Sequence, residues 1–241
     1  GPFPQSFTVI DYQGTIGGLG FDGLSFSSVN PHLSGSLVHD TENTQIKAQI
    51  SAADSVVWKG GISNVWDVNT TANWVLGSDS TTASKYYDYD VVNFDDTGLD
   101  RSTVSLQGTI APSTVKVANT LGTYTFEGAA ISGPASLVKE GTGDLVLLND
   151  NSFGGTVTVN DGSVIVGNGG TTGGLSGNIT NNATLAINRT DDFTFSTNST
   201  GTGKLLKLGT NTVTVNRTQS NTGGTVIDSG TLALAANNIL T

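Results

Sequence analysis

TVTVNDGSVIVG, residues 156–167, is the stretch that decides the fold. It consists of two short segments of alternating apolar residues joined by a small polar turn. Residues two apart in a strand point to the same face, so each segment predicts a strand with one apolar face. Further copies are LVKEGTGDLVLL (137–148), NITNNATLAIN (178–188), LLKLGTNTVTVN (205–216), TVIDSGTLALA (225–235) and TVKVANTLGTYTFEG (114–128).

The spacing of these turns predicts a β-solenoid. The small turn residues Gly122, Gly141, Gly162, Ala183, Gly209 and Gly230 are separated by 19, 21, 21, 26 and 21 residues. A step near twenty residues with strand periodicity is what one coil requires. Residues 191–203 fall in the 26-residue step and predict a longer surface loop there. The apolar pairs should face inward, and they are Tyr124/Phe126, Leu145/Leu147, Val157/Val159, Val164/Val166, Leu185/Ile187, Val213/Val215 and Leu232/Leu234.

Composition agrees with a turn-rich all-β chain. The 241 residues include 32 Gly and no Cys, and 12% are charged. The net charge of −10 lies mostly in residues 1–104, which hold 12 acidic and 4 basic residues, against 8 and 6 in residues 105–241. Without clustered Lys and Arg, we expect neither nucleic-acid binding nor membrane contact. Without Cys, no disulfide framework is available.

Three sections follow from the change in pattern along the chain. Residues 1–53 are expected to be the end of a preceding module, with strands at 7–12, 24–26, 36–39 and 45–50 and a hairpin turn at 40–43. Residues 54–104 form a Trp- and Asp-rich β insertion or cap. Residues 105–241 form the parallel β-helix repeats, and the last residues, AANNILT (235–241), predict the start of a further coil in a longer protein.

All three tryptophans, Trp58, Trp66 and Trp74, lie in the middle section at intervals of eight residues. One interpretation is an aromatic platform that stacks on sugar rings, assisted by Asp67 and Asn73. The other is that the indoles pack inward and cover an open end of the coil stack, because Trp is a large apolar contributor that is usually buried.

An acidic cluster, Asp88, Asp90, Asp95 and Asp96, with Asp100 nearby, is the candidate metal site. Ca²⁺ takes six to eight oxygen ligands, which such carboxylates supply. The spacing does not match an EF-hand loop. The alternative is a solvated turn that closes a strand over residues 87–94, in which case the protein needs no cofactor.

The remaining residues do not assemble into an enzyme. His32 and His39 are the two histidines, and no nucleophile elbow or metal-binding His pair accompanies them. Asp191 and Asp192 are the one adjacent acidic pair within residues 105–241. We therefore expect no catalytic residues.

Two parts of the predicted solenoid resemble a known repeat family. SLVKEGTGDLVL and NSFGGTVTVNDGSVIVGNGG, within 136–170, resemble the autotransporter-associated β-strand repeat, and the signature recurs at Leu205, Lys207, Gly209, 222–225 and 230–232. The family implies a right-handed parallel β-helix in a secreted or surface-anchored passenger, which serves as an adhesin, stalk or scaffold and usually lacks catalytic residues. Glu140 and Leu208 depart from the pattern, because they occupy a slot that is usually small and polar.

The first functional hypothesis is therefore a structural and adhesive module of a long bacterial protein, located outside the cell or on its surface. The expected partners are cell-surface glycans, host or neighbouring cell surfaces, and adjacent repeats of the same chain, with the fragment itself a monomer. The alternative is a carbohydrate-binding module centred on the Trp section. A third hypothesis, an ice- or crystal-surface binder, would use outward threonines at 156, 158, 212, 214 and 225, but the coils look too irregular for it.

Overall fold

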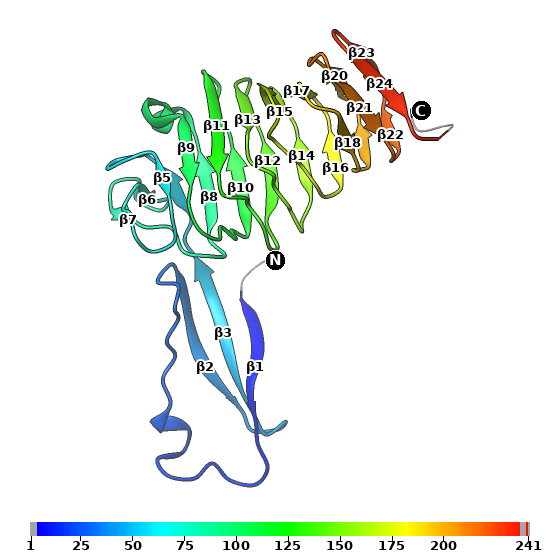
Figure 1. Cartoon of the computed structure of the whole chain (residues 1–241). Coiled ribbons are helices and arrows are strands. Elements are labelled where there is room, and N and C mark those ends of the chain that lie inside the picture. The colour runs from blue at the N-terminus through cyan, green and yellow to red at the C-terminus, as the bar shows by residue number, and fades with distance from the viewer. Residues whose placement is uncertain (1–3, 237–239, 241) are drawn as a thin grey trace. The chain divides into compact units, whose positions relative to one another are not determined.

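The computed structural model describes residues 4–236 and 240. The chain divides into two compact units, Gly1–Ser55 and Val56–Thr241 (Figure 1). Nearly all of the section predicted at 54–104 thus belongs to the same unit as residues 105–241. Of the predicted further coil at 235–241, residues 237–239 and 241 lie outside the described residues.

The first unit contains a three-stranded antiparallel sheet in the order β1 (Gln5–Asp11), β3 (Gln45–Ala53), β2 (Leu33–Asp40). The hairpin turn predicted at 40–43 is confirmed, since β2 and β3 pair up to Asp40 and Gln45. The side chain of Asp40 closes this turn by accepting a hydrogen bond from the backbone N–H of Asn43 at 3.1 Å. The strand predicted at 24–26 is wrong: these residues are irregular and follow a short 3-10 helix, η1 (Gly20–Gly23).

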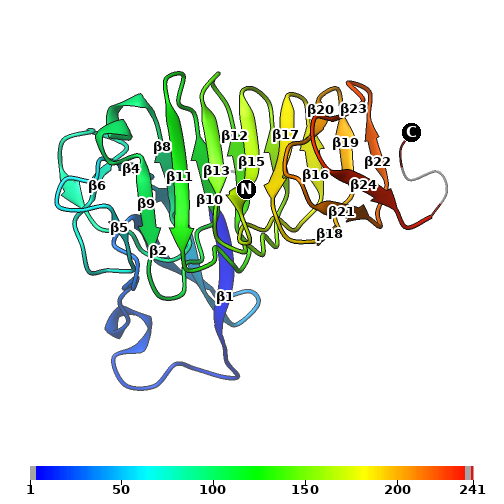
Figure 2. The ribbon, with the colours of Figure 1, turned by 45° about the horizontal axis from the view of Figure 1, so that its top comes forward.

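The second unit is a parallel β-solenoid with two long sheets and one short sheet, whose strands succeed one another in chain order except at β6 and β7, which lie beyond β4 at one edge (Figures 1 and 2). The ten-stranded sheet runs β22 (Gln219–Asn221), β19 (Ser199–Gly201), β16 (Ile179–Asn181), β14 (Val157–Val159), β12 (Ser136–Lys139), β10 (Thr114–Val117), β8 (Val91–Phe94), β4 (Val56–Trp58), β6 (Trp74–Leu76), β7 (Ala83–Ser84). The eight-stranded sheet runs β23 (Thr225–Ile227), β20 (Lys204–Lys207), β17 (Thr184–Arg189), β15 (Ser163–Gly170), β13 (Asp144–Leu147), β11 (Thr123–Gly128), β9 (Thr103–Leu106), β5 (Val65–Trp66). The short sheet runs β18 (Phe193–Phe195), β21 (Thr212–Val215), β24 (Thr231–Leu234).

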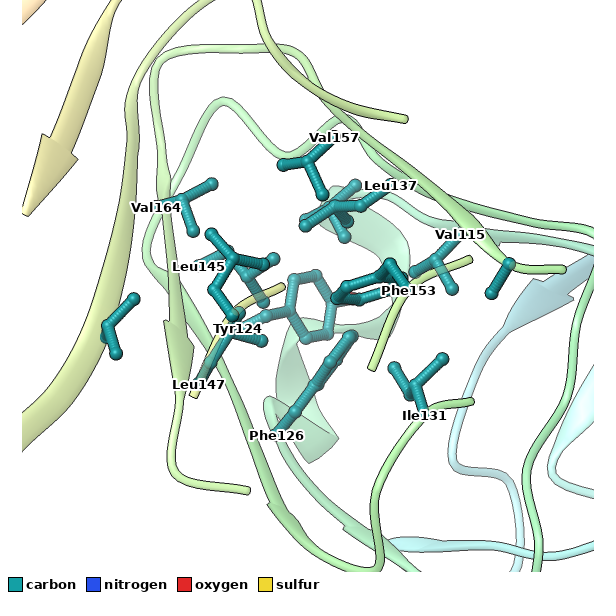
Figure 3. Close-up of a cluster of buried hydrophobic side chains, with 14 of the residues drawn as sticks. Val115, Tyr124, Phe126, Ile131, Leu137, Leu145, Leu147, Phe153, Val157 and Val164 are labelled. Carbon is teal, nitrogen blue, oxygen red and sulfur yellow. The ribbon is translucent and has the colours of Figure 1, made fainter. Parts of the chain in front are cut away.

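The predicted inward alternation is confirmed in the body of the solenoid. In β12, β13 and β21, buried residues alternate with half-buried ones, and Leu145, Val159 and Val213 have no exposed surface. Side chains from successive coils meet in one continuous core (Figure 3). Each fully buried aliphatic side chain contributes about 1.5–3 kcal/mol by leaving water. Leu234 shares the inward register with Val215 but is 47% exposed, because no described strand stacks on β24.

The predicted longer loop at 191–203 is wrong. These residues contain β18 and β19, and β18 is the first strand of the short sheet. On this third side, earlier coils have irregular backbone joined by isolated bridges such as Ile110 to Ile131. The turn at Gly209 therefore lies one corner further around the coil than the turn at Ala183, which explains the 26-residue step.

The coil stack begins with an aromatic region rather than with another regular coil. There β4 pairs in parallel with β8 on one side and antiparallel with β6 on the other, and β6 pairs with the two-residue strand β7. A short antiparallel edge of this kind is a poor template for a further parallel strand. This region corresponds to the cap that the sequence predicts as one interpretation of residues 54–104.

Candidate functional site: the Trp and Asp section and two lysine corners

The three indoles lie in the core at the start of the coil stack. Trp58 and Trp66 have no exposed surface and Trp74 is 1% exposed. Trp74 contacts both other indoles edge to face, with ring centroids 5.0 Å from Trp58 and 5.3 Å from Trp66. Trp66 also reaches Phe126 in the coil stack at 5.9 Å. An aromatic platform for sugar binding needs exposed ring faces, and these rings offer none.

The two polar side chains proposed to assist sugar binding hold the loops between these tryptophans. Asp67 accepts hydrogen bonds from the backbone N–H and the hydroxyl of Thr71, at 2.8 and 2.7 Å. Asn73 is 1% exposed, accepts from the backbone N–H groups of Ile62 and Ser63, and donates to the carbonyl of Val65. Their hydrogen-bonding capacity is used within the fold.

Asp88 and Asp90 also serve the backbone around them. Asp88 accepts hydrogen bonds from the hydroxyl of Tyr86 and the backbone N–H of Ala111, at 2.9 and 3.1 Å. Asp90 is 3% exposed and accepts from the backbone N–H of Tyr87. Burial, together with the neighbouring Asp88, raises the pKa of the Tyr86 hydroxyl far above its usual range, so this hydroxyl remains a donor.

Asp95 and Asp96 cap two different turns. Asp95 begins the 3-10 helix η2 (Asp96–Arg101) and accepts from the backbone N–H of Thr97 at 2.9 Å. Asp96 instead binds the next coil, where it accepts from the backbone N–H groups of Thr120 and Leu121 at 2.8 and 2.9 Å. Its bonds from Thr120 and Leu121 lower the pKa of Asp96. Within residues 4–236 and 240, no three His, Cys, Asp or Glu side chains are grouped as a metal site would require.

The acidic pair and the histidines do not converge. Asp191 forms an ion pair with the buried guanidinium of Arg189 at 2.7 Å, whereas Asp192 caps the next coil through the backbone N–H of Thr212. His39 is hydrogen-bonded to the hydroxyl of Tyr12 at 2.6 Å. His32 lies in the first unit with 7% of its surface exposed.

Sequence reasoning missed two lysines that lie inside the solenoid. Lys139 in β12 is fully buried and Lys207 in β20 is 1% exposed. The Nζ of Lys139 donates to the carbonyls of Glu140 and Gly141, at 2.6 and 2.7 Å. The Nζ of Lys207 donates to the carbonyls of Gly209 and, one coil further, Ser229. The signal was present in the sequence, since both lysines occupy the inward phase of an alternating strand.

We call the turns at 139–144 and 207–212 the lysine corners. A glycine lies beneath each corner in the next coil, Gly162 with φ 63° and Gly230 with φ 71°. A Cβ on Gly162 would lie 2.2 Å from the carbonyl oxygen of Gly143, and a Cβ on Gly230 would lie 2.4 Å from that of Asn211. Burial lowers the pKa of both lysines. Each corner therefore combines a buried ammonium, the carbonyls that it binds, and a glycine that leaves room for them.

Comparison with known families places both corners within matched segments. The sequence model of the passenger-associated-transport-repeat family matches residues 137–166 and 205–234. Two segments of the chain thus match the passenger-associated-transport repeat, and we refer to them as the two repeats. Each repeat begins at the strand that bears the buried lysine and ends at the strand after the stacked glycine. This confirms the resemblance recognised in the sequence.

The two departures from the repeat pattern lie outside the core. Glu140 follows the lysine of the first repeat and forms an ion pair with Lys116 at 2.8 Å, and both side chains are about 40% exposed. Leu208 in the second repeat is also partly exposed. Both positions face away from the core, so a larger residue fits in this slot of the chain.

One curated relative is the Adhesin BmaC autotransporter of Brucella suis biovar 1 (strain 1330). It is 36% identical over 125 residues, which amount to 51% of this chain and 4% of the adhesin. The chain thus spans a small fraction of this relative. No solved structure matches the chain. Among the described residues, no helix has the length and apolar character that crossing a bilayer requires.

Proposed function

We propose that this chain is a structural and adhesive module of a long passenger-type protein, displayed outside the cell or on the bacterial surface. The observation that carries the proposal is that both passenger-associated-transport repeats are built into one uninterrupted core. Their most unusual polar groups, the buried lysines, are used to hold corners. The similarity to an adhesin supports the same function.

In this proposal, the stacked coils act as a spacer and contact surface. Every coil adds a ladder of backbone hydrogen bonds and a layer of apolar side chains, which makes a solenoid a stiff element that depends only on its neighbours. The outward side chains are free to vary without loss of the fold, and they would contact glycans, host or neighbouring cell surfaces, and adjacent repeats of the same protein. The proposal includes no catalysis and no bound cofactor.

A bead-attachment assay tests this function. Beads coated with the native chain are presented to cultured animal cells and to immobilised glycans, and attachment is counted under flow. The control beads carry the Val159→Asp variant, whose folded core we expect to be disrupted. Attachment that requires the folded chain supports an adhesive module, and attachment no greater than that of the control limits the role to a spacer. Release of soluble sugar or peptide from the presented surface would contradict the proposal.

A further inference from the structure

The outer faces of the two long sheets differ in chemistry. On the ten-stranded sheet, strand register places Thr158, Thr180, Thr200 and Ser220 side by side on successive coils. On the eight-stranded sheet, the corresponding outward positions of five successive strands are aliphatic. Four of them are Val146, Ile165, Ala186 and Leu206, on β13, β15, β17 and β20, and the fifth is Val226 on the edge strand β23, which is 47% exposed.

We call the first four of these residues the outer aliphatic row, because their strand register places them on the side of the sheet opposite the inward-facing residues. Val146, Ile165 and Leu206 alternate with inward-facing neighbours and are partly exposed, whereas Ala186 between two of them is 1% exposed. Leu148 and Leu208, which directly follow the inward residues of β13 and β20, add to the same face and are also partly exposed. Contiguous apolar surface on the outside of a soluble protein commonly marks an interaction site.

We propose that the outer aliphatic row docks a second copy of this chain, face to face, about a two-fold axis that runs parallel to the strands between β15 and β17. This axis places β13 of one copy over β20 of the other, and β15 over β17. The larger Ile165 then lies over the smaller Ala186 of the second copy, and Val146 lies over Leu206. Two sheets packed face to face lie about 10 Å apart with their side chains interdigitated, and the small Ala186 leaves room for Ile165.

Charge supports the same arrangement. A second line of outward residues lies on the same four strands, two residues before the aliphatic row. It consists of Asp144, Ser163, Thr184 and Lys204, which are paired in register. The two-fold axis exchanges the ends of this line, so each Asp144 lies over a Lys204 of the other copy. An interface of this kind is self-complementary, as a closed two-fold dimer needs.

The geometry also limits the strength of the contact. Glu127 on β11 and Asp228 after β23 lie at equivalent ends of the face, and the two-fold axis brings these like charges together. On the same two strands, Val226 of β23 lies over the polar Thr125 of β11. The apolar contact is therefore confined to four strands, about 20 Å by about 10 Å at the usual strand spacing. A stable interface needs about 800 Å² from each partner. The expected contact is a weak and reversible one, which tandem copies on a surface would strengthen through multivalency.

Sedimentation velocity tests the proposal over concentrations from about 20 µM to about 1 mM, which covers the dissociation constants of weak and reversible contacts. We expect the weight-average mass of the native chain to rise with concentration toward that of a dimer. Ile165→Lys should abolish the rise, because it buries two unpaired charges at the centre of the contact. The matched control is Thr180→Lys on the outer face of the ten-stranded sheet, which should associate like the native chain.

Charge variants test the axis itself. Lys204→Glu should weaken association at least about tenfold by opposing Asp144 of the second copy, and the double variant Asp144→Lys with Lys204→Glu should restore it. Circular dichroism confirms that each variant is folded. A chain that stays monomeric at about 1 mM would overturn the proposal. So would a dimer that persists in Ile165→Lys but dissociates in Leu234→Lys, because the contact would then lie at the exposed last coil.

Discussion

The two passenger-associated-transport repeats share a sequence pattern but occupy different sides of the coil. The first begins on the ten-stranded sheet and turns at its lysine corner into the eight-stranded sheet, whereas the second begins on the eight-stranded sheet and turns into the short sheet. Lys139 and Lys207 nevertheless bind the carbonyls of their corners in the same way. The repeat therefore encodes a corner and the coil beneath it, and two different corners of the three-sided coil accept it.

The repeats also differ in how well they are covered. Val159 in the first repeat and Ile227 in the second are equivalent, 68 residues apart, and both face inward by register. Val159 has no exposed surface, whereas Ile227 is 51% exposed because no described strand stacks on β23. The same sequence pattern thus gives different burial, which depends on the neighbouring coils.

The largest expected effect comes from placing a charge at these two equivalent positions. Val159→Asp should lower the free energy of unfolding by more than about 4 kcal/mol, because it buries an unpaired carboxylate between two coils. Ile227→Asp should cost less than about 1 kcal/mol, because its carboxylate reaches water. Denaturant unfolding measures both, and hydrogen exchange locates the coils that open. Equal losses would contradict the inferred difference in coverage.

A methyl group beneath the first lysine corner should have the next largest effect. Gly162→Ala combines a positive φ with a Cβ 2.2 Å from the carbonyl oxygen of Gly143, so we expect a loss of about 2–4 kcal/mol. The control is Gly224→Ala, whose φ of 78° is also positive but whose Cβ meets no atom within 4 Å. It should cost only the backbone strain, about 1 kcal/mol. Thermal and denaturant unfolding compare the two, and similar values would show that the close approach in the corner is unimportant.

Removing the ammonium itself should have a smaller effect. Lys139→Met leaves the carbonyls of Glu140 and Gly141 without their donor, and we expect a loss of about 1–2 kcal/mol at neutral pH. Lys204→Met, an exposed lysine, is the control and should change stability by less than about 0.5 kcal/mol.

The difference in stability between the native chain and Lys139→Met should depend on pH. Burial lowers the pKa of Lys139 in the native state below its ordinary value of 10.5. At pH values between the native pKa and 10.5, the unfolded chain therefore binds more protons than the native chain. The free energy of unfolding of the native chain should therefore rise relative to that of Lys139→Met as the pH approaches 10.5. A difference that stays constant with pH would show that the lysine titrates alike in both states.

Much of the solenoid could be predicted because its evidence is local. The alternation of Val157 and Val159, or of Leu145 and Leu147, fixes which face of each strand is buried, and the small turn residues fix the length of a coil. The third side could not be predicted, since its backbone is irregular in the early coils and pairs only through bridges such as Ile110 to Ile131. The spacing between small turn residues therefore does not reveal that Gly209 lies at a different corner of the coil from Ala183.

The candidate residues were harder to interpret because their roles depend on contacts distant in sequence. Evenly spaced tryptophans fit a sugar platform and a buried cap equally well until Trp66 is seen beside Phe126, sixty residues later. Asp96 looks like a metal ligand beside Asp95, but its hydrogen bonds go to Thr120 and Leu121 in the next coil. The inward phase of Lys139 is visible in the sequence, but lysine is almost never fully buried without a partner, and its carbonyl partners become apparent only in the folded corner.

The smallest effect is expected from removing metal ions, and it concerns the Asp section rather than either repeat. Asp88, Asp95 and Asp96 each accept hydrogen bonds from a different turn, so none needs a cation to neutralise it at neutral pH. We expect the melting temperature to be the same in EDTA and in added Ca²⁺, measured by circular dichroism on the same preparation. A ligand that binds only the native state must raise its stability. The contrary result would be that Ca²⁺ restores several degrees of melting temperature that EDTA removes, that Asp95→Asn abolishes this response, and that the control Asp192→Asn retains it. The turn-capping role assigned to the Asp section would then be wrong, and the cluster would be a calcium site.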